Sequence, residues 1–163
     1  GHPTRRCTCT AGQVSRYLSR ISGPLLDRID LQVEILPVPF MELQSMASGE
    51  KSADIRARVV RAREIQSRRF ADTPGVHCNA QMTPRLIARW ARPADEAMRV
   101  LETTMTRFDM SARAYDRILK VARTIADLDP ANIAADPDFP ISAIHMHEAV
   151  SYRNLDRSSW GLK

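Results

Sequence analysis

Arginines at the ends of predicted elements are the residues of this chain best suited to bind an anion. Arg113 follows Ser111, a helix-capping residue, by two positions, so its guanidinium lies beside the free N–H groups of a helix N-terminus. A helix end with an arginine beside it can hold a phosphate group. Arg28 lies on a tight turn before an alternating apolar stretch, where it either projects from the turn or pairs with Asp27 or Asp30.

The sulfur and imidazole side chains give weaker indications. Cys7 and Cys9 form a C-x-C pair, a spacing that occurs in metal sites and among structural cysteines alike. Cys78 stands alone in a predicted loop, and we interpret it as structural. His145 and His147 are two positions apart and face opposite sides of a helix, so we expect one to be packed and the other exposed.

The composition is typical of a globular protein in a reducing compartment. Of the 163 residues, 44 % are hydrophobic and 26 % are charged, which excludes a disordered, collagen-like or disulfide-stapled chain. The three cysteines cannot all pair, and no apolar run is long enough for a membrane span or a signal peptide. We therefore expect a cytoplasmic protein with no membrane partner.

The positive charge comes almost entirely from arginine, with 21 Arg and 3 Lys against 19 acidic residues. The net charge of +5 permits nucleic-acid or phosphate partners, although a GC-rich genome would also favour arginine. The densest group lies between positions 52 and 70 and is either a nucleic-acid face or, as we prefer, a solvated helix face with Asp54 and Glu64 interspersed. Its members are Arg56, Arg58, Arg61, Arg63, Arg68 and Arg69.

One strand and several helices are predicted to position these residues. Thr10 and Gln13 form a capping box that starts a short helix, followed by a turn at 25–28. The residues from Ile29 to Ile35 alternate between apolar and polar types, as in a half-buried strand. Apolar residues spaced by three and four predict further helices, and three prolines predict a loop between 129 and 140. These helices span 52–70, 83–90, 93–108, 111–128 and 142–152.

A lone strand cannot satisfy its own backbone groups, so we expect sheet partners upstream of this sequence. The predicted chain is mainly α, with a short helix and the last strand of a missing α/β core before a helical bundle. Its predicted divisions are a tag remnant with a cysteine segment (1–9), the end of the core (10–40), a linker (41–51), a helical domain (52–156) and a tail (157–163).

Four motifs, in order along the chain, carry a resemblance to a known family. The first is SGPLLDRIDL from Ser22 to Leu31. The others are AREIQ from Ala62 with Arg68, LKVARTIADL from Leu119, and HEA from His147 with Tyr152 and Arg153. Together they resemble magnesium-chelatase-like AAA+ ATPases, and most closely the YifB/ComM branch, from Cys7 to Asp156. The resemblance implies that residues 52–156 are the helical lid of such an ATPase.

The resemblance also implies what this sequence lacks. Family members bind ATP and Mg²⁺ through a glycine-rich phosphate loop and an acidic strand, and no G-x-x-x-x-G-K-[ST] occurs here. We therefore expect the parent protein to be an enzyme and this chain alone to bind no cofactor and to hydrolyse no ATP. The expected partners of the chain are its own ATPase core and neighbouring subunits of a ring, taken as a hexamer.

Two arginines match functional positions of the family. Arg28 corresponds to an arginine finger that reaches a neighbouring subunit's nucleotide in trans, and Arg113 corresponds to sensor 2, which contacts the nucleotide phosphates. A permanently charged guanidinium can stabilise the charge that develops on a transferred phosphoryl group. In the YifB/ComM branch, a C-x-C pair such as Cys7 and Cys9 follows an earlier pair, which implies half of a possible zinc site.

The resemblance leaves three functions open. The first is the lid of a DNA helicase or branch-migration motor of the ComM type, which the C-x-C pair favours. The second is a magnesium chelatase subunit that inserts the metal into protoporphyrin. The third is a non-enzymatic basic helical module that binds nucleic acid. A lid should change its behaviour when it is joined to its ATPase core and ATP is added, whereas a binding module should not.

Overall fold

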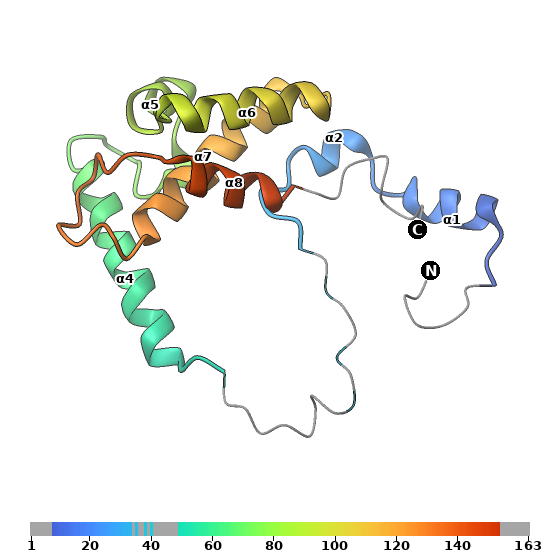
Figure 1. Ribbon diagram of the computed structural model, residues 1–163, viewed down its shortest axis with the longest axis horizontal. Helices are drawn as coiled ribbons and strands as arrows, with labels where there is room; N and C mark the ends of the chain where they lie inside the picture. The colour runs from blue at the N-terminus through green and yellow to red at the C-terminus, as the bar shows by residue number, and fades with distance from the viewer. Residues whose placement is uncertain (1–7, 34, 36–37, 39, 41–48, 154–163) are drawn as a thin grey trace. The chain divides into compact units, whose positions relative to one another are not determined.

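The computed structural model describes residues 8–33, 35, 38, 40 and 49–153. The chain divides into two compact units, Gly1–Met46 with Tyr152–Lys163 and Ala47–Ser151. Figure 1 shows the helices of both units, coloured along the chain.

Among the described residues of the first unit are the short helices α1 and α2. α1 (Ala11–Leu18) begins with the predicted capping box, in which Thr10 Oγ1 accepts the N–H of Gln13 at 3.3 Å. The side-chain oxygen of Gln13 in return accepts the N–H of Thr10 at 2.8 Å. α2 (Gly23–Leu26) is a single helical turn that begins earlier than the turn predicted at 25–28.

The prediction of a strand from Ile29 to Ile35 is wrong, because no described residue of that stretch forms a strand. Isolated hydrogen bonds hold the segment: Gln32 N–H donates to Tyr152 O at 2.7 Å, and Arg153 Nη1 donates to Ile29 O at 2.8 Å. A strand needs a neighbour for its ladder, and the described residues supply none. The apolar side chains are therefore exposed, by 38 % at Ile29, 52 % at Leu31, 62 % at Val33 and 88 % at Ile35.

The second unit is helical, which confirms the mainly α fold class. Each predicted helix is present with its ends within two residues of the prediction. A short 3₁₀ turn, η1, in the connection after the first of these helices was not predicted. The elements are α4 (Ser52–Arg69), η1 (Asn79–Gln81), α5 (Pro84–Trp90), α6 (Asp95–Arg107), α7 (Ala112–Leu128) and α8 (Ala143–Ser151).

None of the helices in the described part of the chain combines the length and the apolar character needed to cross a lipid bilayer.

A local cap holds the start of α7, and a long-range backbone contact holds the start of α6. Ser111 caps α7 as predicted, and its Oγ accepts the N–H of Ala114 at 3.3 Å. Pro93 forms an isolated parallel bridge with Ile141, and Ala94 N–H donates to Ile141 O at 3.0 Å. This bridge ties the start of α6 to the residue that leads into α8.

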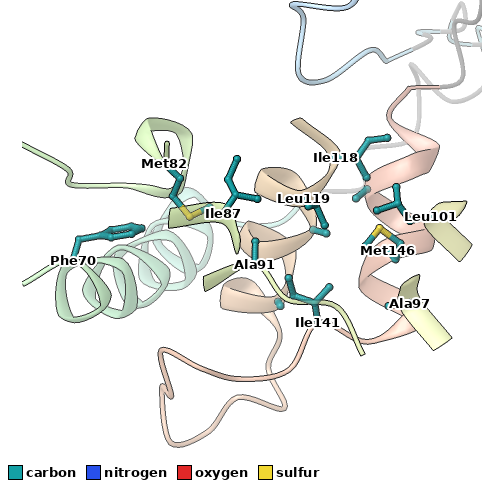
Figure 2. Close-up of a cluster of buried hydrophobic side chains, with 13 residues drawn as sticks. Phe70, Met82, Ile87, Ala91, Ala97, Leu101, Ile118, Leu119, Ile141 and Met146 are labelled. Atoms are coloured by element: carbon teal, nitrogen blue, oxygen red, sulfur yellow. The ribbon is translucent and has the colours of Figure 1, made fainter. Parts of the chain in front are cut away.

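α7 lies at the centre of the second unit. It contacts α4, α5, η1 and α8, and α6 packs on α8 (Figure 1). Figure 2 shows Ile118 of α7 near Leu101 of α6 and Met146 of α8 in the buried cluster. Burial of such side chains contributes about 1.5–3 kcal/mol each, so the core fixes the position of α7. Of its predicted apolar face, Tyr115 and Ile125 are half-buried, and the buried members are Ile118, Leu119, Ala122 and Ala126.

Candidate functional site

Arg113 lies in the first turn of α7, at a helix N-terminus that carries no acidic residue in that turn. Its side chain is exposed, and its guanidinium makes no hydrogen bond or ion pair with any residue that the structure describes. The helix end offers partial positive charge and free N–H groups, of which the cap Ser111 satisfies one. The arrangement can therefore accept an anion from outside the described residues.

Arg28 lies in the first unit, two residues beyond the end of α2. The residue is exposed, and its Nη1 donates to the backbone oxygen of Pro24 at 3.1 Å. This hydrogen bond anchors the guanidinium at the helical turn and uses one of its five N–H donors. Arg28 and Arg113 belong to different units, and each is described within its own unit.

The predicted cysteine pair is only partly described. Cys7 lies outside the described residues, and Cys9 is exposed just before α1. A structural zinc ion needs four ligands. Among the described residues no three His, Cys, Asp or Glu side chains come together. The half zinc site expected at Cys7 and Cys9 stays a prediction.

Sequence analysis missed a buried ionic cluster at Asp127, near the end of α7. Arg69 Nη1 donates to Asp127 Oδ2 at 2.7 Å, and Arg69 Nη2 donates to Oδ1 of the same carboxylate. Arg123 Nε donates to Asp127 Oδ1 at 3.1 Å. Asn79 Nδ2 at 2.8 Å and Gln66 Nε2 at 3.3 Å donate to Oδ2. One carboxylate thus joins α4, η1 and α7.

The members of this cluster are withdrawn from water. The Asp127 and Arg69 side chains are 0 % exposed, and that of Arg123 is 2 % exposed. Burial lowers the pKa of Arg123 from its usual value, and the charge of Arg69 acts in the same direction, while the Asp127 carboxylate opposes both. Arginine keeps its charge in proteins, so two buried cations face one buried anion. The cluster therefore carries an excess positive charge.

The same arginines hold the loop between α7 and α8. Arg69 Nη2 donates to Pro137 O at 2.7 Å, and Arg123 Nη1 donates to Phe139 O at 2.6 Å. A loop that runs over a helix bundle leaves carbonyl groups to be satisfied, and these guanidinium groups satisfy two of them. The cluster thereby ties the loop to the frame that also fixes α7.

The arginines of α4 do not form one uniform solvated face, contrary to the preferred interpretation of the sequence. Arg61 Nη2 donates to Asp129 O at 3.0 Å, and Arg68 Nη2 donates to Ala135 O at 2.7 Å. With the buried Arg69, these residues bind the loop after α7 and are structural. Arg58 forms an exposed bidentate pair with Glu50 at 2.6 and 2.9 Å.

The two histidines behave as predicted, because His145 is buried and His147 is exposed. Ser142 N–H donates to His145 Nδ1 at 3.1 Å, so the proton of the neutral ring lies on Nε2. Nε2 lies 2.7 Å from Asp129 Oδ2. The pKa of Asp129 is lowered, first by the N–H of Ala131 and then by the hydrogen bond from His145. The pair links the start of the loop to α8.

Comparisons with known proteins show the family of this chain. Residues 49–153 match the family described as "Magnesium chelatase, subunit ChlI C-terminal", and residues 1–43 match "Magnesium chelatase, subunit ChlI". The protein YifB of Salmonella typhimurium is 43 % identical over 150 residues, and YifB of Escherichia coli is 42 % identical over 150 residues. Each of these alignments covers 91 % of this chain and 27 % of the relative.

A third relative points to the same branch. The competence protein ComM of Haemophilus influenzae is 39 % identical over 146 residues, which cover 89 % of this chain and 26 % of that protein. The chain thus spans about a quarter of the length of these relatives. The family matches cover both the segment around Arg28 and the helical unit around Arg113. The chain therefore belongs to the magnesium chelatase ChlI family, and residues 49–153 are its C-terminal domain.

Proposed function

We propose that the helical unit is the lid of an AAA+ ATPase and that Arg113 contacts the phosphates of a nucleotide bound by the rest of that protein. The observation that carries the proposal is the exposed Arg113 guanidinium, without a described partner, at the capped N-terminus of α7. The membership of the magnesium chelatase family supports an enzyme of this type. ATP, Mg²⁺ and the other subunits of a ring are the expected cofactors and partners of the whole protein.

The frame around Arg113 suits this role. α7 is anchored along its length, by the apolar core at Ile118 and by the buried carboxylate of Asp127 near its far end. A cation on a rigid helix is already in place when charge develops on a phosphoryl group, so no reorganisation is needed. The lid would then move as a rigid body, with the N-terminus of α7 in contact with the nucleotide.

Arg28 is proposed as the arginine finger that completes the site of a neighbouring subunit. Its side chain is exposed on the turn after α2, and a single described hydrogen bond, to Pro24 O, must break for it to reach outward. Arginine fingers stabilise the charge on the transferred phosphoryl group and contribute about 10³–10⁵ to the rate.

The experiment uses the full-length protein that contains this chain. Arg113→Ala should lower the kcat of ATP hydrolysis by about 10²–10³-fold, the size expected for loss of one preorganised donor. Arg99→Ala, which removes another exposed helical arginine, is the matched control and should keep the parent rate. An Arg113→Ala enzyme that retains more than about half of the parent rate would exclude the assigned role.

The work done by the motor is proposed to be on DNA, as in a helicase or branch-migration enzyme. The name of the Haemophilus relative, a competence protein, supports this choice over metal insertion into protoporphyrin. ATP hydrolysis by the full-length protein should rise several-fold with branched DNA. Stimulation by a porphyrin and Mg²⁺ instead would favour the chelatase, and nucleic-acid binding that ignores nucleotide would favour a binding module.

A further inference from the structure

A polar cleft lies beside the buried cluster, on the side of α5. Its volume is about 380 Å³, and it is lined by Arg89, Trp90, Arg92, Arg123 and Asp138. Trp90 ends α5, Arg123 belongs to α7, and Asp138 comes from the loop before α8. Three separate segments of the second unit thus contribute to one cleft.

Two donors in the lining are buried and lack a hydrogen-bond partner among the described residues: Arg123 Nη2 and Trp90 Nε1. Arg123 is already fixed, since Nε donates to Asp127 and Nη1 donates to Phe139 O. The third nitrogen, Nη2, therefore has no described acceptor, although the side chain is only 2 % exposed. Proteins rarely leave buried donors unpaired, so each of these groups can donate to an acceptor that enters the cleft.

The charge of the cleft has the sign that an acceptor anion needs. Arg89 lies over the ring of Trp90, with its Cζ 4.5 Å from the ring centroid. Arg92 Nε donates to Ala88 O at 2.8 Å, which holds that guanidinium near the end of α5. Both side chains are exposed, so their charges face solvent at the rim of the cleft.

The lining contains three guanidinium groups and a single carboxylate, that of Asp138. Next to the cleft, the single negative charge of Asp127 balances only one of the two positive charges of Arg69 and Arg123. The donors come from different segments, and clustered guanidinium groups are well suited to bind the oxygens of a phosphate group.

We propose that this cleft is a phosphate-binding site in which Arg123 Nη2 and Trp90 Nε1 donate to the phosphate oxygens and Arg89 and Arg92 cover it. The site is separate from the proposed nucleotide contact at Arg113, because it lies beside the loop that follows the other end of α7. The phosphate is either a free ion or a backbone group of single-stranded DNA.

The indole N–H of Trp90 reports directly on the proposed contact. The chain carries two tryptophans, Trp90 and Trp160, so a Trp160→Phe background leaves one indole ¹⁵N–¹H resonance. Inorganic phosphate, added at constant ionic strength against chloride, should shift this resonance along a saturable curve. A resonance that does not move in excess phosphate overturns the proposal.

Variants distinguish phosphate binding in the cleft from non-specific attraction of phosphate to the basic surface of the chain. Trp90→Phe keeps an aromatic ring but removes the donor, and it should weaken phosphate binding in calorimetry about tenfold. Asp138→Asn removes the competing carboxylate and should strengthen binding several-fold, while Arg99→Gln, outside the cleft, should leave the affinity unchanged. If Trp90→Phe and Arg99→Gln weaken binding equally, or if Asp138→Asn has no effect, the cleft is not the site.

The source of the phosphate is distinguished by a second ligand. A short oligothymidylate that binds more tightly than inorganic phosphate, and that loses affinity about tenfold with Trp90→Phe, assigns the cleft to a DNA backbone. Inorganic phosphate that binds at least as tightly as the oligonucleotide assigns it to a free ion. If neither ligand depends on Trp90, the proposal fails.

Discussion

Asp127 on α7 and Arg69 on α4 form an ion pair whose two side chains are both 0 % exposed. The carboxylate also accepts hydrogen bonds from Arg123, Asn79 and Gln66, so it is the common acceptor of donors from α4, η1 and α7. The position of α7, and with it that of Arg113, depends on the buried charge of Asp127, and the sequence alone does not show that this charge is buried.

Asp127→Asn should destabilise the second unit strongly. The substitution leaves Arg69 and Arg123 as buried cations without a counter-charge, and breaking a buried pair in this way costs about 3–5 kcal/mol. Urea unfolding measures the loss as a lower midpoint. The control is Glu102→Gln on the exposed face of α6, which should change the free energy of unfolding by less than about 0.5 kcal/mol. A loss below about 1 kcal/mol for Asp127→Asn would contradict the structural role.

Asp129 should contribute to the loss of stability in acid. The pKa of its carboxyl is lowered in the folded chain, mainly by the Ala131 N–H and then by His145. Its stabilisation is therefore fully present above the unfolded pKa of about 3.9 and is lost as the pH falls through the lower folded pKa. The difference in unfolding free energy between the wild type and Asp129→Asn should be constant near neutral pH and should shrink below about pH 4. A difference that grows on acidification has the wrong sign for this interaction.

Arg28 and Arg113 should serve one nucleotide site from opposite sides of a subunit interface. In the full-length protein, Arg28→Ala should lower kcat by about 10³–10⁵-fold without affecting folding. Mixing Arg28→Ala subunits with Arg113→Ala subunits should then restore activity, because about one interface in four of a randomly mixed ring has both arginines. Steady-state ATP hydrolysis of the mixture measures this recovery. Mixtures as inactive as the separate variants would place both residues on the same side.

Hydrogen exchange should separate the two units. Amides in the middle of α7 should be the slowest of the described chain, since they lie in the core. Between Ile29 and Val33 we expect little protection in dilute solution apart from Ile29, which donates to Leu26 O, and Gln32, which donates to Tyr152 O. The exposed apolar residues there can pair with another copy, so their protection should rise with protein concentration. Strong protection of every amide from Ile29 to Val33 at low concentration would mean that this segment forms a strand ladder within the chain.

The helices could be predicted because their determinants are local. Ser111 caps α7 and the Thr10–Gln13 box caps α1, and the apolar spacing of α7 correctly predicted most of its buried face. The strand was predicted wrongly for the opposite reason. Alternation from Ile29 to Ile35 shows only what a strand would bury, whereas forming one requires hydrogen-bond partners that the described residues do not supply.

The buried cluster could not have been found by periodicity alone. Arg123 and Asp127 stand at i and i+4 on one helix, which is a common surface spacing, and Arg69 is one of many arginines in its helix. Only packing decides that these three charges meet away from water. The same holds for the cleft, where Arg123 and Trp90 are 33 positions apart in the sequence.

The sequence by itself determined the family, the helix boundaries and the two arginines proposed to act on a nucleotide, because motifs, caps and spacing are written in neighbouring residues. The tertiary structure alone decided which arginines are structural and which are free. Arg61, Arg68, Arg69 and Arg123 satisfy loop carbonyls. Arg113 has no described partner. The physical reason is that desolvation and hydrogen-bond satisfaction depend on which segments pack together, and identical side chains differ only in that environment.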